Sequence, residues 1–121
     1  MNQAMTNIAD AVRGNKKFKS ALYAVNTRQN GHIEVLYRDT LVALIMPTLV
    51  HINTGGWYTV TTRRVINAVL FGAETRSQVY QHKFKWGLLR RDEDGVPVND
   101  QLFDQYDRFA LPIARHLPTS A

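Results

Sequence analysis

Residues 48–70 read TLVHINTGGWYTVTTRRVINAVL and carry, in order, the signals of a strand, a sharp turn and a helix. The apolar residues Leu49, Val50 and Ile52 favour an extended strand. Gly55-Gly56 follows and supplies the positive φ angles that a tight reversal requires. The sequence therefore predicts that the chain turns back sharply just before the aromatic pair Trp57-Tyr58.

A short central helix is predicted after this turn. Thr61 or Thr62 can accept a hydrogen bond from the first N–H groups of a helix that starts near Arg63. Its apolar residues at positions 65, 66, 69 and 70 would share one face. Arg63 and Arg64 would then lie in the first turn, where the helix dipole disfavours each positive charge by roughly 0.3–1 kcal/mol. A role other than helix stability therefore selects these arginines, and both are candidate binding residues.

The composition fits one globular domain. The chain has 121 residues, of which 45% are hydrophobic and 21% charged, and it has no cysteine. Disulfides and thiolate metal sites are therefore excluded. The N-terminus lacks the pattern of a signal peptide, and the longest apolar run, residues 41–46, is too short to cross a bilayer. We expect a soluble cytoplasmic protein that makes no membrane contact.

The predicted fold is a single α+β domain with an antiparallel sheet of about five strands. A helix over residues 1–14 precedes the sheet and the central helix, which occupy residues 20–91. Residues 78–89 are predicted to form one long strand. The segment 92–121 is acidic, and Asn99 or Asp100 would cap a last helix whose stripe consists of Leu102, Phe103, Tyr106 and Phe109.

The charge is distributed unevenly along the chain. Residues 1–91 carry 13 Lys and Arg against 4 acids, whereas residues 92–121 carry 2 against 6. A basic body predicts a polyanionic or acidic partner. The alternative is that the two surfaces complement each other within the fold or keep the protein soluble.

The central segment resembles a family of small proteins encoded by bacteriophages and prophages, which have no assigned function. The resemblance rests on Thr54-Gly55-Gly56-Trp57, Thr59, Thr61-Thr62-Arg63-Arg64 and Ile66-Asn67, and it extends roughly from Tyr37 to Trp86. It implies a phage-type accessory protein that acts inside the bacterial host cell. It transfers no catalytic residue, and the N-terminal helix and the acidic segment lie outside it.

The sequence offers no signal for catalysis, a metal or a cofactor. His32, His51, His82 and His116 are scattered without the spacing of metal ligands. The Asp92-Glu93-Asp94 run lacks the rest of a calcium loop and is interpreted as a turn. We therefore expect a protein that is not an enzyme and that holds no cofactor.

The binding residues are predicted to form a basic surface with an aromatic pair. The candidates are Trp57, Tyr58, Arg63, Arg64, Lys83, Lys85, Arg90 and Arg91. Tryptophan, tyrosine and arginine are the residue types that concentrate binding energy at protein interfaces. The expected function is binding of a host protein or nucleoprotein complex, as an anti-defence or host-takeover inhibitor, and assembly of several copies through an edge strand is compatible with it.

The alternative function is direct binding of DNA or RNA. Lys83 and Lys85 would project from one face of the long strand, and Tyr80, Phe84 and Trp86 from the other. The aromatic face is then more consistent with a core than with a stacking platform. The cations would contact phosphates, so this binding would be sensitive to salt and weakly selective for sequence.

Overall fold

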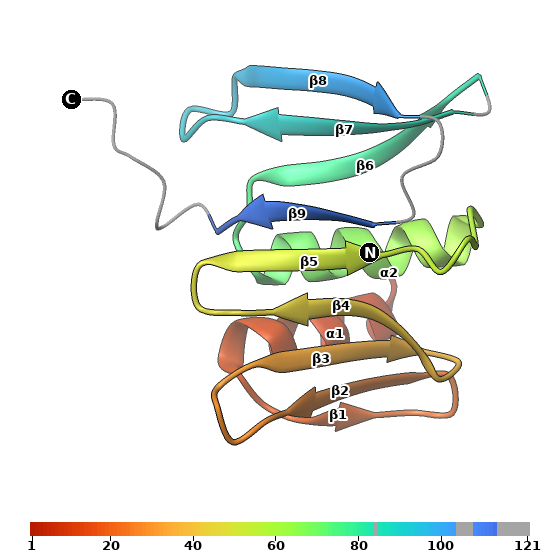
Figure 1. The fold of residues 1–121 in the computed structure, drawn as a ribbon, viewed down its shortest axis with the longest axis vertical. Coiled ribbons are helices and arrows are strands. Elements are labelled where there is room, and N and C mark those ends of the chain that lie inside the picture. The colour runs from red at the N-terminus through yellow and green to blue at the C-terminus, as the bar shows by residue number, and fades with distance from the viewer. Residues whose placement is uncertain (84, 104–107, 114–121) are drawn as a thin grey trace.

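The computed structural model describes residues 1–83, 85–103 and 108–113 of the chain. It confirms an α+β domain with two helices, in which the described strands pair antiparallel (Figure 1). The elements are α1 (Gln3–Gly14), β1 (Phe18–Lys19), β2 (Tyr23–Thr27), β3 (Ile33–Tyr37), β4 (Thr40–Ile45), β5 (Leu49–Asn53), α2 (Val60–Gly72), β6 (Ser77–His82), β7 (Lys85–Arg91), β8 (Pro97–Phe103) and β9 (Arg108–Pro112). The strands of the described part are thus more numerous than the five expected from the sequence.

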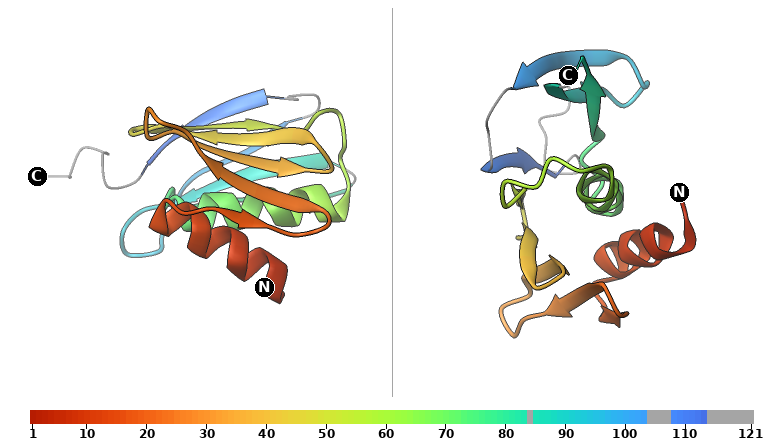
Figure 2. Two further views of the ribbon diagram at one scale, coloured as in Figure 1. Left: turned by 90° about the horizontal axis from the view of Figure 1, so that it is seen from below. Right: turned by 90° about the vertical axis from the view of Figure 1, so that its right-hand side faces the viewer.

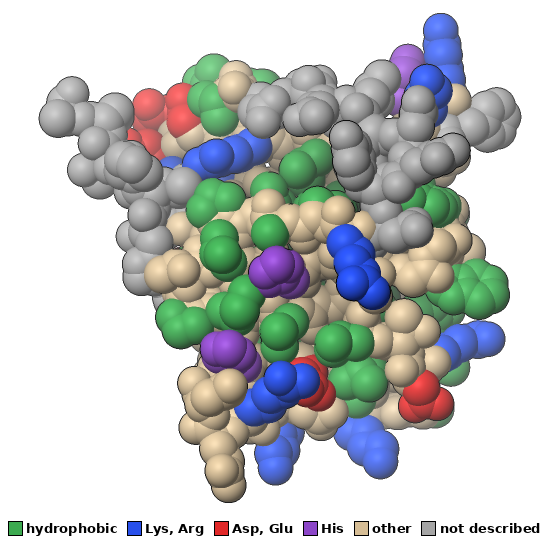
Figure 3. Space-filling view, in the orientation of Figure 1, with side chains coloured by type: hydrophobic (Ala, Val, Ile, Leu, Met, Phe, Trp, Pro, Cys, Tyr) green, Lys and Arg blue, Asp and Glu red, His purple; other side chains and the backbone are tan. Residues whose placement is uncertain are grey.

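The strands form two sheets that α2 joins. The larger sheet has the order β1-β2-β3-β4-β5-β9, and the smaller one has the order β6-β7-β8. Both helices lie against the same face of the larger sheet, and α2 also lies beside β6 (Figure 2). The opposite face of the larger sheet is open, and Figure 3 shows hydrophobic side chains spread across it. One core cluster extends from α1 through both sheets to Ile113.

The N-terminal helix α1 forms as the sequence predicts. Met5, Ile8 and Val12 are buried on its inner face. The Asn2 side chain caps the helix by accepting a hydrogen bond from the Met5 N–H at 2.9 Å. The helix ends at Gly14, as predicted, and the left-handed residue that follows it is Asn15, with φ of 49°.

The two helices cross with almost no space between their backbones. A Cβ added at Gly72 of α2 would lie 2.5 Å from the Ala9 carbonyl oxygen and 2.9 Å from the Ala9 Cα of α1. Real Cβ atoms do not approach backbone atoms so closely, so this crossing requires glycine. The close approach places α1 and α2 side by side under the larger sheet.

The predicted strand over residues 78–89 is wrong, because the chain reverses within it. His82 pairs with Lys85 across a two-residue turn, and Lys83 adopts a φ of 49° there. Left-handed lysine is uncommon, so sequence alone gave no reason to expect a turn between these residues. The result is the hairpin β6–β7 in place of one long strand.

The predicted C-terminal helix is also wrong. Asn99 and Asp100 lie in β8, which pairs with β7, and Phe109 lies in β9, which pairs with β5. Tyr106 lies outside the described residues. The two neighbouring strands offer backbone hydrogen bonds over five or more residue pairs each, and this pairing outweighs the local helical spacing.

The basic connector before the first predicted strand contributes the short strand β1. Phe18 packs against the core, whereas Lys19 is exposed. The next strand, β2, begins at Tyr23, because a hydrogen-bonded turn at Ser20 precedes it.

Candidate binding surface

The loop between β5 and α2 is rigidly built. Gly55 and Gly56 have φ angles of 65° and 79°, which confirms the predicted Gly-Gly turn. The Asn53 side chain accepts from the Gly55 N–H at 3.0 Å, and the Thr54 hydroxyl accepts from the Gly56 N–H at 3.2 Å. The Trp57 N–H donates to the Thr54 carbonyl at 3.1 Å. These bonds fix the direction in which Trp57 leaves the turn.

The two tryptophans have opposite environments. Trp57 is 62% exposed, whereas Trp86 of β7 is 3% exposed and belongs to the core. Tyr58 connects them, because its ring meets the Trp86 ring edge to face with centroids 4.9 Å apart. Trp57 is therefore a surface residue, and Tyr58 attaches the loop to the smaller sheet.

The helix α2 begins earlier than its sequence suggests. Thr59, and not Thr61 or Thr62, is the N-cap, and its hydroxyl accepts from the Thr62 N–H at 3.2 Å. The same Thr59 hydroxyl donates to the buried Thr62 hydroxyl at 3.0 Å. Arg63 consequently lies one position beyond the first turn, so the prediction that Arg63 and Arg64 lie in the first turn of this helix is wrong.

Arg63 and Arg64 face different neighbours. The Arg63 guanidinium donates to the Gln81 side chain of β6 at 2.9 Å. Arg64 is exposed and, with Met1, Met5 and others, lines a separate depression of about 440 Å³ near the N-terminus. Of these two arginines, Arg63 is therefore the one that contacts the β6–β7 hairpin.

The two lysines of the hairpin do not lie on the side that the sequence predicted, opposite Tyr80. Lys83 lies in the turn, and Lys85 shares the outer face of the hairpin with Tyr80 and His82. The other face carries Trp86, which is buried. Aromatic and cationic side chains therefore share the outer face, which a single straight strand would not allow.

Arg90 and Arg91 lie at the opposite end of the molecule. Arg90 pairs with Ser77, just after the C-terminus of α2, and the Arg91 guanidinium donates to the Gly95 carbonyl at 3.0 Å. The acidic run 92–94 forms the adjoining β7–β8 turn, as predicted, and the Asp92 carboxylate accepts from two of its N–H groups. Figure 3 shows these acidic side chains and the basic hairpin tip at opposite ends of the smaller sheet.

The structure thus gathers five of the eight candidate residues at one end, which we call the aromatic-basic end. Its members are Trp57, Tyr58, Arg63, Lys83 and Lys85. The right-hand view of Figure 2 looks onto this end, where the N-terminus of α2 and the hairpin tip both point toward the reader. Arg64 lies on the neighbouring side of α2, and Arg90 and Arg91 do not belong to the aromatic-basic end.

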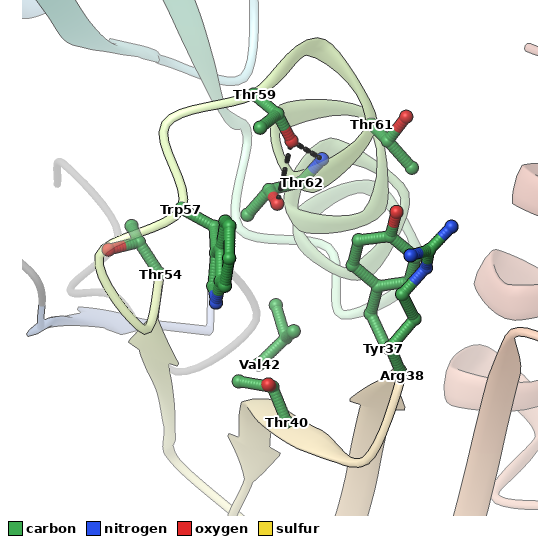
Figure 4. A pocket seen from close by; sticks show the side chains of 9 residues that line it. All are labelled: Tyr37, Arg38, Thr40, Val42, Thr54, Trp57, Thr59, Thr61 and Thr62. Atoms are coloured by element: carbon green, nitrogen blue, oxygen red, sulfur yellow. Dashed lines mark hydrogen bonds between the residues drawn. The ribbon is translucent and has the colours of Figure 1, made fainter.

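A pocket that the sequence did not reveal adjoins this end. Its volume is about 360 Å³, and it lies between the β3–β4 turn, the Gly-Gly turn and the start of α2 (Figure 4). The lining residues are Tyr37, Arg38, Thr40, Val42, Thr54, Trp57, Thr59, Thr61 and Thr62. Arg38 carried no sequence signal, because its turn comes next to Trp57 only through the folding of the sheet.

The comparisons with known proteins give a family. The family model described as Kyanoviridae Gp96 protein matches residues 1–110. The chain belongs to this family. It is a phage protein, which confirms the phage origin implied by the resemblance, and the match includes the N-terminal helix and part of the acidic segment. No curated protein and no solved structure matches the chain.

Two further observations concern metals and membranes. Among the described residues, no group of three or more His, Asp or Glu side chains is arranged to hold a metal ion. Within the same part of the chain, neither helix is long and apolar enough to span a membrane.

Proposed function

We propose that this phage protein is a non-enzymatic accessory protein that binds a host protein or nucleoprotein complex through the aromatic-basic end. The observation that carries the proposal is the exposure of Trp57, which is 62% accessible beside the cations of α2 and the hairpin. An exposed tryptophan on a rigid loop loses little conformational entropy on binding, and tryptophan is enriched among the residues that dominate interface energies.

The charges at this end favour an acidic or polyanionic target. Lys83 and Lys85 project from the hairpin, and the acidic turn at residues 92–94 lies at the far end of the same sheet. Such a separation steers an acidic partner toward the basic end and raises the association rate at low salt.

A binding role fits the chemistry of the pocket better than a catalytic role. Its nine lining residues contain one charged side chain, that of Arg38, and no carboxylate or histidine. General acid and base catalysis most often uses those absent types. By covering a functional surface of a host complex in the cytoplasm, the protein would act as a host-takeover or anti-defence inhibitor.

The test is capture of targets from host lysate by tagged protein, with and without nuclease, at two salt concentrations. We expect a discrete host protein that survives nuclease and that is lost with Trp57→Ala and with Lys83→Glu. The matched control is Lys17→Glu, which makes the same charge change on the exposed connector between α1 and β1. Equal loss with all three variants, or no retained protein, would contradict the proposal.

A second candidate is direct, weakly sequence-selective binding of nucleic acid, and the outer face of the hairpin favours it. The Tyr80 ring lies across Gly87, since a Cβ added there would be 2.2 Å from the Tyr80 Cζ. His82 and Lys85 lie on the same face. Aromatic rings that lie on a sheet beside cations are suited to stack bases and contact phosphates.

This candidate makes a different prediction for the same preparation. Affinity for generic single-stranded oligonucleotides should fall steeply as salt rises, and Lys85→Ala should weaken all sequences about equally. Capture of nucleic acid alone, released by nuclease and salt, would favour this candidate over the host-protein target. Light scattering on the purified protein would show whether several copies assemble.

A further inference from the structure

The pocket beside Trp57 has two walls of different chemistry. In Figure 4 the Trp57 indole stands as one wall, and the side chains of Tyr37 and Arg38 form the wall opposite. The Arg38 guanidinium lies 5.7 Å from the centroid of the Tyr37 ring, and that ring stacks on Tyr23 with centroids 5.5 Å apart. The flat ring of Trp57 therefore faces the Arg38 cation, which lies beside the stacked Tyr37 ring.

The hydroxyls around the pocket divide into engaged and available groups. The Thr59 hydroxyl bonds to the Thr62 N–H and hydroxyl, and the Thr54 hydroxyl accepts from Gly56. The hydroxyls of Thr40 and Thr61 have no partner within the described part of the chain. Figure 4 places Thr40 at the base of the pocket and Thr61 on the same side of the pocket as Arg38. Each hydroxyl can donate or accept a hydrogen bond.

The backbone at Arg38 adds an independent observation. Arg38 and Asp39 form the two-residue turn between β3 and β4, and their φ angles are 47° and 66°. Such a turn favours asparagine followed by glycine, because other residues with a Cβ are strained in the left-handed region. An arginine in this conformation lowers the local stability of the turn. Its presence is therefore better explained by a role for its guanidinium than by a preference of the turn for arginine.

We propose that this pocket binds a nucleotide unit. The base stacks on Trp57, its polar edge reaches Thr40, and the phosphate meets Arg38 and Thr61. A volume of about 360 Å³ is within the range of small-molecule pockets. Stacking tolerates any base, and hydroxyls accept either a donor or an acceptor edge, so discrimination among bases is expected to be weak.

The nucleotide can be free or part of a single strand, and two arms of one experiment distinguish these sources. The first arm titrates the purified protein with each nucleoside 5′-monophosphate, with the matching uncharged nucleosides and with inorganic phosphate. The second arm uses a single-stranded oligodeoxythymidylate and its duplex. Fluorescence of the exposed Trp57 reports stacking, since the buried Trp86 is shielded, and calorimetry follows the variants.

Saturable quenching by monophosphates is expected, with weaker binding of nucleosides and of phosphate alone. Trp57→Ala should reduce affinity by roughly tenfold or more, because it removes the stacking surface. Arg38→Asn should reduce affinity for the monophosphates by roughly tenfold and leave nucleoside binding unchanged. Asparagine tolerates the left-handed turn, so this variant keeps the fold while it removes the guanidinium.

The outcomes separate clearly. Tighter binding of the monophosphate than of the oligonucleotide assigns a free nucleotide, and the reverse assigns a nucleotide within a single strand. Binding that survives Arg38→Asn unchanged, or no saturable response to any nucleotide or single strand, would overturn the inference. Arg64→Ala is the matched control, since Arg64 lies in a separate depression and its loss should leave affinity unchanged. The assay needs only purified protein, so its result does not depend on the host target.

Discussion

The Asn67 side chain on α2 pairs with the backbone of Val79 on β6 through both the nitrogen and the oxygen of its amide. The Asn67 Nδ2 donates to the Val79 carbonyl at 2.9 Å, and the Val79 N–H donates to the Asn67 Oδ1 at 2.7 Å. One helical turn earlier, Arg63 donates to Gln81, two residues further along β6. Four helical residues and two strand residues both advance the chain by about 6 Å, so α2 and β6 remain in step.

This pairing covers the free edge of the smaller sheet. β6 is an edge strand, and the side chain of Asn67 takes the place of a neighbouring strand at Val79. The contact also fixes where the hairpin tip lies relative to the loop that carries Trp57. The geometry of the aromatic-basic end therefore depends on a residue outside it.

Replacing Asn67 with alanine should destabilise the protein by about 2–3 kcal/mol, because the N–H and the carbonyl of the buried residue Val79 both lose their hydrogen-bond partner. Asn67→Asp should be at least as damaging, since a carboxylate faces the Val79 carbonyl. Denaturant unfolding measures the loss, and the amide of Val79 should exchange faster with solvent. The control Asn7→Ala removes an amide whose partner is the exposed Gln3 and should cost less than about 0.5 kcal/mol.

The helix crossing gives a second prediction. Gly72→Ala should destabilise the protein by about 2 kcal/mol or more, because its Cβ would overlap the backbone of Ala9 and force the helices apart. Gly14→Ala is the matched control, since a Cβ there would meet only the Lys16 side chain at ordinary contact distance. That change should be neutral or stabilise the protein by about 0.5 kcal/mol. Equal thermal shifts for the two variants would contradict the close crossing.

The sequence predicted the elements whose signals are local. The spacing of Ile8 and Val12 predicted α1, and Gly55-Gly56 predicted the sharp turn. Asn30-Gly31 is likewise a local turn signal, and it lies between β2 and β3, where Gly31 has a φ of 84°. In each case one short segment holds both the hydrophobic pattern and the residue type that ends it.

The missed features depend on contacts between distant segments. Lys83 adopts a left-handed conformation that no local pattern announces. Strand β9 forms because β5 provides a partner more than fifty residues earlier in the chain. The pocket joins Arg38 to Trp57 only when β3, β4 and α2 have assembled. The periodicity of a sequence does not report which distant segments pair, so the candidate site was only partly predictable.

The N-cap of α2 gives a third prediction. Thr59→Ala should destabilise the protein by about 1–2 kcal/mol, since the Thr62 N–H and the buried Thr62 hydroxyl both lose their partner. Thr59→Ser keeps the hydroxyl and should restore most of the stability. Thr61→Ala removes a hydroxyl with no partner in the described residues and should change stability by less than about 0.5 kcal/mol. Circular dichroism during thermal unfolding ranks the three variants.

The two tryptophans give the last prediction, because their environments separate binding from stability. Trp57→Ala should change the free energy of unfolding by less than about 0.5 kcal/mol, since the side chain is mostly exposed, yet it should abolish capture of the target. Trp86→Ala should cost about 3–5 kcal/mol, because it opens a cavity in the core and removes the partner of Tyr58.

The comparison requires both measurements on both variants. Trp86→Phe keeps an aromatic ring against Tyr58 and should retain most of the stability and the capture of the target. A loss of stability with Trp57→Ala as large as that with Trp86→Ala would mean that the loop residue is a structural one. Unchanged capture by a stable Trp57→Ala variant would remove Trp57 from the binding surface and leave the cations of α2 and the hairpin to account for it.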